Sequence, residues 1–173
     1  YLGTGLGGAL VVDGRLVRGS NGVAGELGHI KIRGSDAQCG CGERGCLEAV
    51  VGGRALDTTI ATRWPGSGDA ERWTVVDVDR ASRAGDADAR AFWEEVAEHI
   101  GSALGGIVTA LDPSHVLLGG VLERAPDLTV RVSAQIQRSS ARHAREGLRV
   151  VTGLLGDSAG ALGAAASIGA HAD

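Results

Sequence analysis

The sequence predicts an α/β fold with a mixed sheet. Three observations support this class: a hairpin signal near the N-terminus, a long stretch of helical periodicity in the middle, and two short apolar segments that alternate with helical ones after it. Strands that alternate with helices are typical of α/β domains. With 43% hydrophobic and 22% charged residues, the 173-residue chain can bury a sizeable core, as one domain or as two small lobes.

The hairpin is indicated by Asp13-Gly14, which lies between the apolar segments 6–12 and 15–18. Asp-Gly between such segments favours a two-residue turn that joins antiparallel strands. The glycine-rich, polar stretch 19–45 follows and is expected to be irregular. It carries the first histidine of the chain and two of its three cysteines, and the third cysteine comes directly after it.

The central part is expected to be helical. Residues 47–62 predict one helix, and the segment 64–69, WPGSGD, predicts a loop because of its proline and glycines. From Asp79 apolar residues recur at steps of three and four for about 30 residues, the period of a helix with one buried face. Gly101 and Gly105 lie four apart on this helix, so we expect another backbone to approach it closely there.

The last third of the chain alternates strands and helices. We expect a short buried strand, a helix, a second strand and a buried closing helix of small residues, at 115–118, 121–139, 148–152 and 158–170. A glycine pair, Gly119-Gly120, follows the first of these strands directly.

Composition argues against several classes of protein. The net charge of -4 argues against nucleic-acid binding through a basic surface. No apolar run reaches the roughly 18 residues of a membrane span, and no signal peptide is visible. Three cysteines do not suit a secreted disulfide framework, so we expect a cytoplasmic protein. The chain lacks methionine and opens on YLGTGLGGALVV, which reads as a strand already under way, so we expect an N-terminal part to be missing.

All three cysteines fall in CGCGERGC, residues 39–46. Cys39 and Cys41 are too close for an easy disulfide, and a redox pair is normally C-x-x-C. Zinc takes four ligands, and His29, ten residues before Cys39, is the nearest histidine upstream. Together with Cys46 these residues would form a Cys3His site. Such a closed site would make the zinc structural, while the alternative is three thiols that bind nothing.

Two motifs together resemble the signature of the ROK family of bacterial sugar kinases and sugar-responsive repressors. They are AGELGHIKI and CGCGERGCLE. The resemblance covers nearly the whole chain and implies the actin-like ATPase (ribonuclease H-like) fold. The chain would be its C-terminal lobe, with a hairpin at 6–18, a zinc and sugar loop at 19–48 and a helical, nucleotide-side portion at 49–173. The N-terminal lobe would be absent.

The resemblance also implies roles for particular residues. Zinc would be held by His29, Cys39, Cys41 and Cys46. Glu26 and Glu48 would accept hydrogen bonds from hydroxyls of a monosaccharide or a derivative, with His29 against the same sugar. If nucleotide binding is retained, it would use two glycine motifs: Gly3, Thr4 and Gly5 would contact the phosphates, and Gly119 and Gly120 would approach the adenosine. Kinases of the family follow the second motif with a third glycine and Val-Ser, whereas this chain reads GGVLERAP.

Three functions are consistent with the resemblance. We favour the sugar-sensing part of a transcriptional regulator, with DNA contacted only through a missing N-terminal segment and with a homodimer as the expected assembly. The first alternative is the C-terminal lobe of a hexose kinase, which would use ATP and Mg2+. The catalytic aspartate and the first phosphate loop of such a kinase would lie in the missing lobe. This chain alone is therefore not expected to be an enzyme. The second alternative is an inactive remnant.

Overall fold

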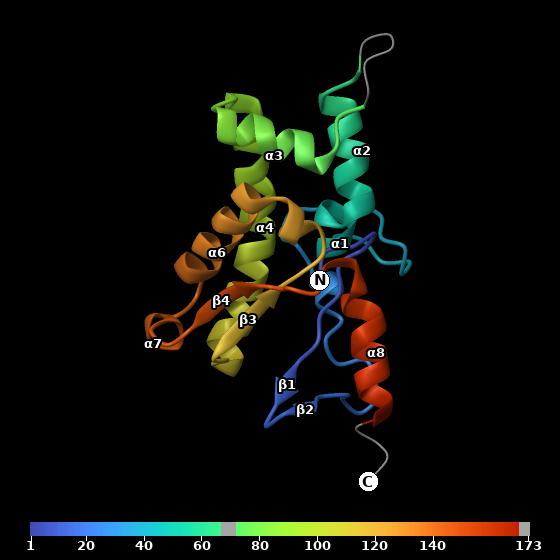
Figure 1. Cartoon of the computed structure of the whole chain (residues 1–173), viewed down its shortest axis with the longest axis vertical. Coiled ribbons are helices and arrows are strands. Elements are labelled where there is room, and N and C mark those ends of the chain that lie inside the picture. The colour runs from blue at the N-terminus through green and yellow to red at the C-terminus, as the bar shows by residue number, and fades with distance from the viewer. Residues whose placement is uncertain (67–71, 170–173) are drawn as a thin grey trace.

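The computed structural model describes residues 1–66 and 72–169 of the chain (Figure 1). Among the described residues the α-helices are α1 Leu47–Val51, α2 Gly53–Arg63, α3 Val75–Ala84, α4 Ala87–Leu111, α5 Val121–Arg124, α6 Pro126–Ser139, α7 Arg142–Arg145 and α8 Ala159–Gly169. The strands are β1 Val11–Val12, β2 Arg15–Leu16, β3 His115–Leu118 and β4 Arg149–Thr152, and the 3-10 helices are η1 Leu27–His29 and η2 Gly156–Ser158. The chain is therefore α/β, as predicted.

The strands form two separate two-stranded sheets. β1 and β2 are antiparallel, and both turn residues, Asp13 (φ 50°) and Gly14 (φ 73°), are left-handed, as the predicted tight turn requires. β3 and β4 are parallel, with His115 opposite Arg149. Leu2 lies between the two sheets, because it forms an antiparallel bridge with Leu6 and a parallel bridge with Gly120. Antiparallel and parallel pairings are therefore both present, but in two separate sheets and not in one mixed sheet.

The core is centred on α4, which packs against α6, α3 and α1 (Figure 1), and buried apolar side chains of α1 and α2 belong to the same core. Gly101 and Gly105 of α4 face α6, where an added Cβ would collide with Gln135 and Ser139. The expected close approach at these glycines is confirmed. The largest fully buried side chain of the core is Trp93, which stacks on Phe92 with ring centroids 5.0 Å apart.

The predicted helix 47–62 is two helices, α1 and α2. Gly52 between them is extended (φ -61°, ψ 156°), and a Cβ there would lie 2.6 Å from the carbonyl oxygen of Glu48. The break turns the start of α2 toward the N-terminal segment, where the N–H of Gly53 donates to the carbonyl of Gly3 at 3.1 Å.

The long helix predicted from Asp79 is also two helices. α3 starts earlier, because Thr74 and Asp77 form a capping box at its N-terminus. Gly85 ends α3 in the left-handed conformation (φ 103°), and Asp86 then caps α4. The helix predicted at 121–139 is likewise divided, because Pro126 starts α6 and has no N–H for a continuous helix.

Two elements predicted as buried are at least partly exposed: β3 buries Leu118 but not Leu117, and α8 is exposed along most of its described side chains. Leu117 of β3 is 66% exposed and Leu162 of α8 is 50% exposed. α8 packs mainly against η2, and its alanines and glycines have little side-chain surface with which to hold a second element. Residue 170, the predicted end of this helix, and residues 67–69 of the predicted loop lie outside the described residues.

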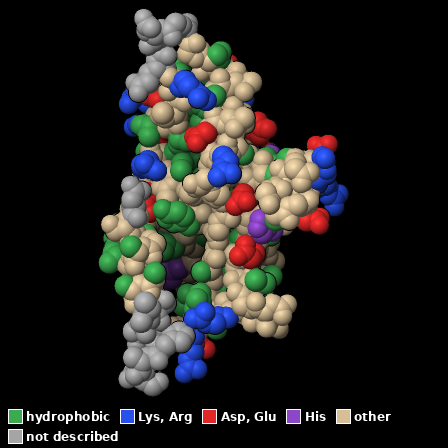
Figure 2. Space-filling view, turned by 90° about the vertical axis from the view of Figure 1, so that its right-hand side faces the viewer, with side chains coloured by type: hydrophobic (Ala, Val, Ile, Leu, Met, Phe, Trp, Pro, Cys, Tyr) green, Lys and Arg blue, Asp and Glu red, His purple; other side chains and the backbone are tan. Residues whose placement is uncertain are grey.

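The surface carries charges of both signs. On the face drawn in Figure 2, acidic and basic side chains are interspersed over most of the molecule. In the described part of the chain, no helix is both long and apolar enough to cross a membrane.

Candidate metal centre

The loop that carries the cysteines is folded back on itself by backbone hydrogen bonds. The N–H of Cys39 donates to the carbonyl of Glu43 at 2.8 Å, and the N–H of Gly42 donates to the carbonyl of Cys39 at 3.1 Å. Gly42 and Gly45 have φ values of 94° and 73°, which side chains other than glycine rarely adopt. This turn brings the sulfur atoms of Cys39, Cys41 and Cys46 together, although an extended chain would hold them apart.

A second set of bonds fixes the turn beside η1. The N–H of Leu47 donates to the carbonyl of Ile30 at 2.8 Å, and the N–H of Ile32 donates to the carbonyl of Gly45 at 2.7 Å. These bonds place Cys46, which directly precedes α1, next to the segment that follows His29. His29 and the cysteines therefore come from two neighbouring backbone segments, one around η1 and one in the turn before α1.

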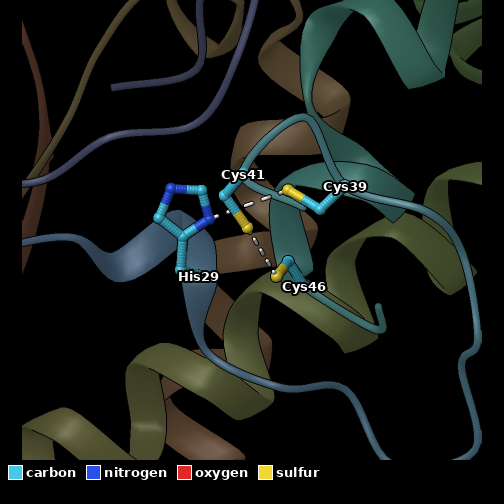
Figure 3. A group of neighbouring side chains, drawn as sticks. All are labelled: His29, Cys39, Cys41 and Cys46. Carbon is cyan, nitrogen blue, oxygen red and sulfur yellow. Dashed lines mark hydrogen bonds between the residues drawn. The ribbon is translucent and has the colours of Figure 1, made fainter. Parts of the chain in front are cut away.

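His29, Cys39, Cys41 and Cys46 form one cluster, in which the four ligand atoms all lie within 4.8 Å of one another (Figure 3). His29 Nδ1 is 3.7 Å from Cys39 Sγ, and Cys41 Sγ is 3.8 Å from Cys46 Sγ. A tetrahedral ion with metal–sulfur bonds of about 2.3 Å places its sulfur ligands about 3.8 Å apart. The three thiols are free, with Cys39 and Cys46 buried and Cys41 exposed. The cluster fits a tetrahedral metal ion.

The surroundings change the acidity of two thiols. A backbone hydrogen bond from Glu43, with a second hydrogen bond from Cys39, lowers the pKa of the Cys41 thiol. At Cys39 a backbone hydrogen bond at Cys41 lowers the pKa, but burial and the neighbouring thiols outweigh it and the pKa is raised. Because the thiolate is the form that binds metal, the lowered pKa favours metal binding by Cys41.

The two predicted sugar ligands lie beside this cluster, Glu26 at His29 and Glu48 at Cys39. Glu26 Oε2 is 3.6 Å from Nε2 of His29, the ring nitrogen that points away from the sulfurs, and its side chain is exposed. Glu48 Oε1 is 3.9 Å from Cys39 Sγ, while its Oε2 accepts the N–H of Leu6 at 2.8 Å. A carboxylate against the second ring nitrogen of a metal-binding histidine orients that ring.

The glycine motifs predicted for a nucleotide lie side by side. The N–H of Leu2 donates to the carbonyl of Gly119 at 3.1 Å, and a Cβ at Gly120 would collide with the carbonyl of Leu2. The carbonyls of Gly3 and Thr4 accept N–H groups from the start of α2, at 3.1 and 2.9 Å. Gly5 is close to the metal centre, because a Cβ there would collide with Glu48 Oε2.

Sequence reasoning missed one charged residue at these motifs, Glu123. Its Oε1 accepts the N–H of Gly120 at 3.2 Å and would be 3.3 Å from a Cβ at Gly119 and 2.8 Å from one at Gly153. The residue is the third of α5, so its sequence position alone suggests a helix-capping role rather than a place beside three glycines. The sequence feature that could have pointed to Glu123 is GGVLERAP, which contains this residue and departs from the pattern of the family kinases.

Comparison with known proteins agrees with the resemblance seen in the sequence motifs. The model of the family described as "ROK family" matches residues 1–170. The chain is 36% identical over 138 residues to the N-acetyl-D-glucosamine kinase of Pectobacterium carotovorum subsp. carotovorum (strain PC1), which is 73% of this chain and 43% of that protein.

Two solved structures are similar in fold. A ROK family glucokinase from Streptomyces griseus, in complex with glucose and AMPPNP, superposes with a TM-score of 0.81 and 32% identity over 96% of this chain and 58% of that one. A ROK family transcriptional regulator, described as a homolog of the E. coli MLC protein, gives a TM-score of 0.74 and 29% identity over 87% of this chain and 40% of that one. The chain spans about half the length of these proteins.

Proposed function

This chain belongs to the ROK family, whose fold is that of the actin-like ATPases, and from this premise we propose that it is the sugar-binding, zinc-containing C-terminal lobe of a sugar-responsive transcriptional regulator. The observation that carries the proposal is the cluster of His29 and three cysteines with Glu26 and Glu48 at its edges. Three thiol ligands suit a reducing compartment such as the cytoplasm.

The metal of the cluster is proposed to be zinc. Three thiolates and an imidazole are the donor set of a structural zinc site, and four protein ligands leave no position for a reacting water. His29, Cys39, Cys41 and Cys46 would hold the ion, which would fix the loop and supply no chemical step. The loop in turn would hold Glu48 and the Glu26–His29 pair in one arrangement.

The ligand of the carboxylates is proposed to be a monosaccharide or a derivative. Carboxylates accept hydrogen bonds from neighbouring hydroxyls, and such charge-assisted bonds are stronger than neutral ones. Glu48 is half-buried and keeps Oε1 free of backbone partners among the described residues, whereas Oε2 is held by Leu6. A sugar that binds there would therefore meet a preoriented acceptor. The kinase relatives named for sugars and the glucose complex of the Streptomyces griseus enzyme support this class of ligand.

One observation favours the regulator over the kinase. Glu123 brings a carboxylate to Gly119 and Gly120, the glycines that the adenosine of a nucleotide would approach, and this negative charge disfavours a ligand as negatively charged as ATP. The regulator would contact DNA through residues ahead of Tyr1 and would act as a dimer, with sugar shifting the balance between two arrangements. The kinase stays as the second candidate, because the kinase relatives are similar over most of this chain.

The test uses the complete protein as its gene encodes it. A candidate operator DNA and a set of monosaccharides are titrated, and ADP formation is followed in parallel with ATP and Mg2+. The proposal expects about one zinc per chain, DNA that is released by one sugar, and no sugar-dependent ADP. Sugar-dependent ADP formation would establish the kinase instead. Intact zinc with no binding of any sugar would support the inactive remnant.

A further inference from the structure

One residue beside the cluster is unusual in the sequence. The chain has 17 lysines and arginines, and Lys31 is the only lysine among them. It lies two residues after His29 and forms a backbone bridge with Cys46. Every other basic side chain is an arginine, so the one compact ammonium group lies next to the metal ligands.

The side chain of Lys31 contacts the turn that carries the cysteines at three points. Its Nζ donates to the carbonyl of Arg44 at 2.8 Å and to Sγ of Cys46 at 3.4 Å, and it lies 3.6 Å from Oε2 of Glu43. Cys46 is fully buried, whereas the lysine side chain is about half exposed (52%). The ammonium group therefore covers one of the buried ligand sulfurs from the solvent side.

A charge argument gives this contact a role. Three thiolates and a neutral histidine around a divalent ion leave a net charge of about -1 on the site. A cation that donates to a thiolate offsets this charge, and an ammonium group has three donors that it can direct separately. A guanidinium has a rigid planar fork, which does not match one carbonyl, one sulfur and one carboxylate in different directions.

We propose that Lys31 is a positioning residue of the metal centre: its ammonium group ties residues 43–46 to the segment after His29 and neutralises the charge of the metal-bound Cys46 thiolate. The inference rests on the proposed zinc site and goes beyond it, because it assigns retention of the ion to a residue that is not a ligand. Groups outside the ligand set change metal affinity by about 10- to 100-fold in other sites.

The experiment compares three variants of the purified, zinc-loaded protein. Lys31→Met removes the charge and keeps most of the stem, Lys31→Arg keeps the charge, and Arg33→Met removes a positive charge two residues away. Arg33 is exposed and has no hydrogen bond or ion pair with the four ligands in the part of the chain that the structure covers. Zinc transfer to a chromogenic chelator is timed, and circular dichroism checks that each variant is folded.

The expected result is transfer about 10-fold faster in Lys31→Met, partial recovery in Lys31→Arg, and the parent rate in Arg33→Met. Equal rates in Lys31→Met and the parent would overturn the inference, and so would equal acceleration by both methionine variants. A parent that carries no zinc at all would refute the proposed metal centre rather than the role of Lys31.

A spectroscopic measurement separates charge from simple loosening of the loop. In the Co2+-substituted protein, loss of a cation from a thiolate should move the thiolate-to-metal charge-transfer band of Lys31→Met to lower energy, and Lys31→Arg should restore it. An unchanged band would refute the electrostatic part. Should Lys31→Met fail to fold, acetylation of the parent with an amine-selective reagent, mapped to Lys31 by mass spectrometry, makes the same comparison.

Discussion

Two regions are ordered in different ways: the metal loop, residues 26–48, and the outer edge, formed by β1, β2, β3, β4, α8 and the residues 153–158 that join β4 to α8. In the metal loop two of the cysteines and Leu47 are buried, and backbone hydrogen bonds join residues of the same loop, such as Leu47 to Ile30. At the outer edge apolar side chains face outward, among them Val11 (65% exposed) and Leu154 (96%). The comparison teaches that residues close in sequence can build an ordered loop here, whereas strands and a helix of small residues depend on partners from elsewhere in the chain.

The largest expected change in stability that tests this contrast follows from the loss of a proposed metal ligand. Cys41→Ser should remove the ion and lower the free energy of unfolding by about 4 kcal/mol when free zinc is about 1,000-fold above its dissociation constant. Cys41 is exposed, so loss of burial contributes little to this figure. Urea unfolding with and without zinc measures it.

The control for the ligand variant lies at the outer edge. Leu154→Ser also introduces a serine, at a side chain that is almost fully exposed, and should change stability by less than about 0.5 kcal/mol. A large loss in this variant, or none in Cys41→Ser, would contradict the contrast between the two regions.

Glycine replacements give the next largest difference. A Cβ at Gly28 would collide with the carbonyl of Leu6, so Gly28→Ala should destabilise by about 1–3 kcal/mol through overpacking. Gly163 of α8 has open space around it, so Gly163→Ala should stabilise the helix by about 1 kcal/mol. Thermal unfolding of both variants should show shifts of opposite sign; shifts of the same sign would show that the two regions do not differ in packing.

A third comparison separates metal retention from ligand binding inside the metal loop. Glu48→Ala should weaken binding of the cognate sugar by about 10-fold, since a hydrogen bond to a charged group contributes roughly 1.5–3 kcal/mol, while zinc content stays at the parent level. Calorimetric titration and elemental analysis measure the two quantities. Asp36→Asn, an exposed carboxylate in the same loop, should leave both unchanged. Parent affinity in Glu48→Ala would remove this residue from the sugar site.

The smallest effect concerns a local structure outside both regions, the capping box of α3. A hydrogen bond from the Thr74 side chain, followed by one from its backbone, lowers the pKa of Asp77. A lowered folded-state pKa means that the bond stabilises the fold above the ordinary pKa near 3.8 and that this stability is lost as the pH falls below it.

Asp77→Asn should therefore cost up to about 1 kcal/mol at pH 7, and the difference from the parent should shrink as the pH drops below about 4. Urea midpoints at several pH values measure it, with Asp88→Asn, an exposed position in the first turn of α4, as the control. A difference that stays constant with pH would refute the assignment to the Asp77 carboxylate.

Much of the architecture follows from local signals. Asp13-Gly14 predicted the tight turn, and the strand at 115–118 lies where its apolar run placed it. The spacing of the cysteines with His29 predicted the cluster, because four ligands within 18 residues can meet through a few glycine turns. The helix breaks at Gly52, Gly85 and Pro126 occur at residue types that often end helices. They were not predicted because helical periodicity continues on both sides of each break.

Other features could not be predicted from periodicity or spacing. The proximity of Glu123 to Gly119 and Gly153 depends on how β3, α5 and the end of β4 meet, and residues 119 and 153 are far apart in sequence. The burial of Asp79, which accepts the N–H groups of Asp127 and Leu128 at 3.0 and 3.3 Å, likewise requires α3 to lie at the start of α6.

By itself the sequence determined the fold class, the family and the cluster of four candidate metal ligands, because each depends on residue types at short, fixed separations. Only the tertiary structure decided which groups surround those ligands: Lys31 on Cys46, Glu48 against Leu6 and Cys39, and Glu26 on the far side of His29. The physical reason is distance along the chain. Local backbone preferences act over a few residues, whereas side-chain contacts between distant segments arise only when packing and hydrogen bonds have brought those segments together.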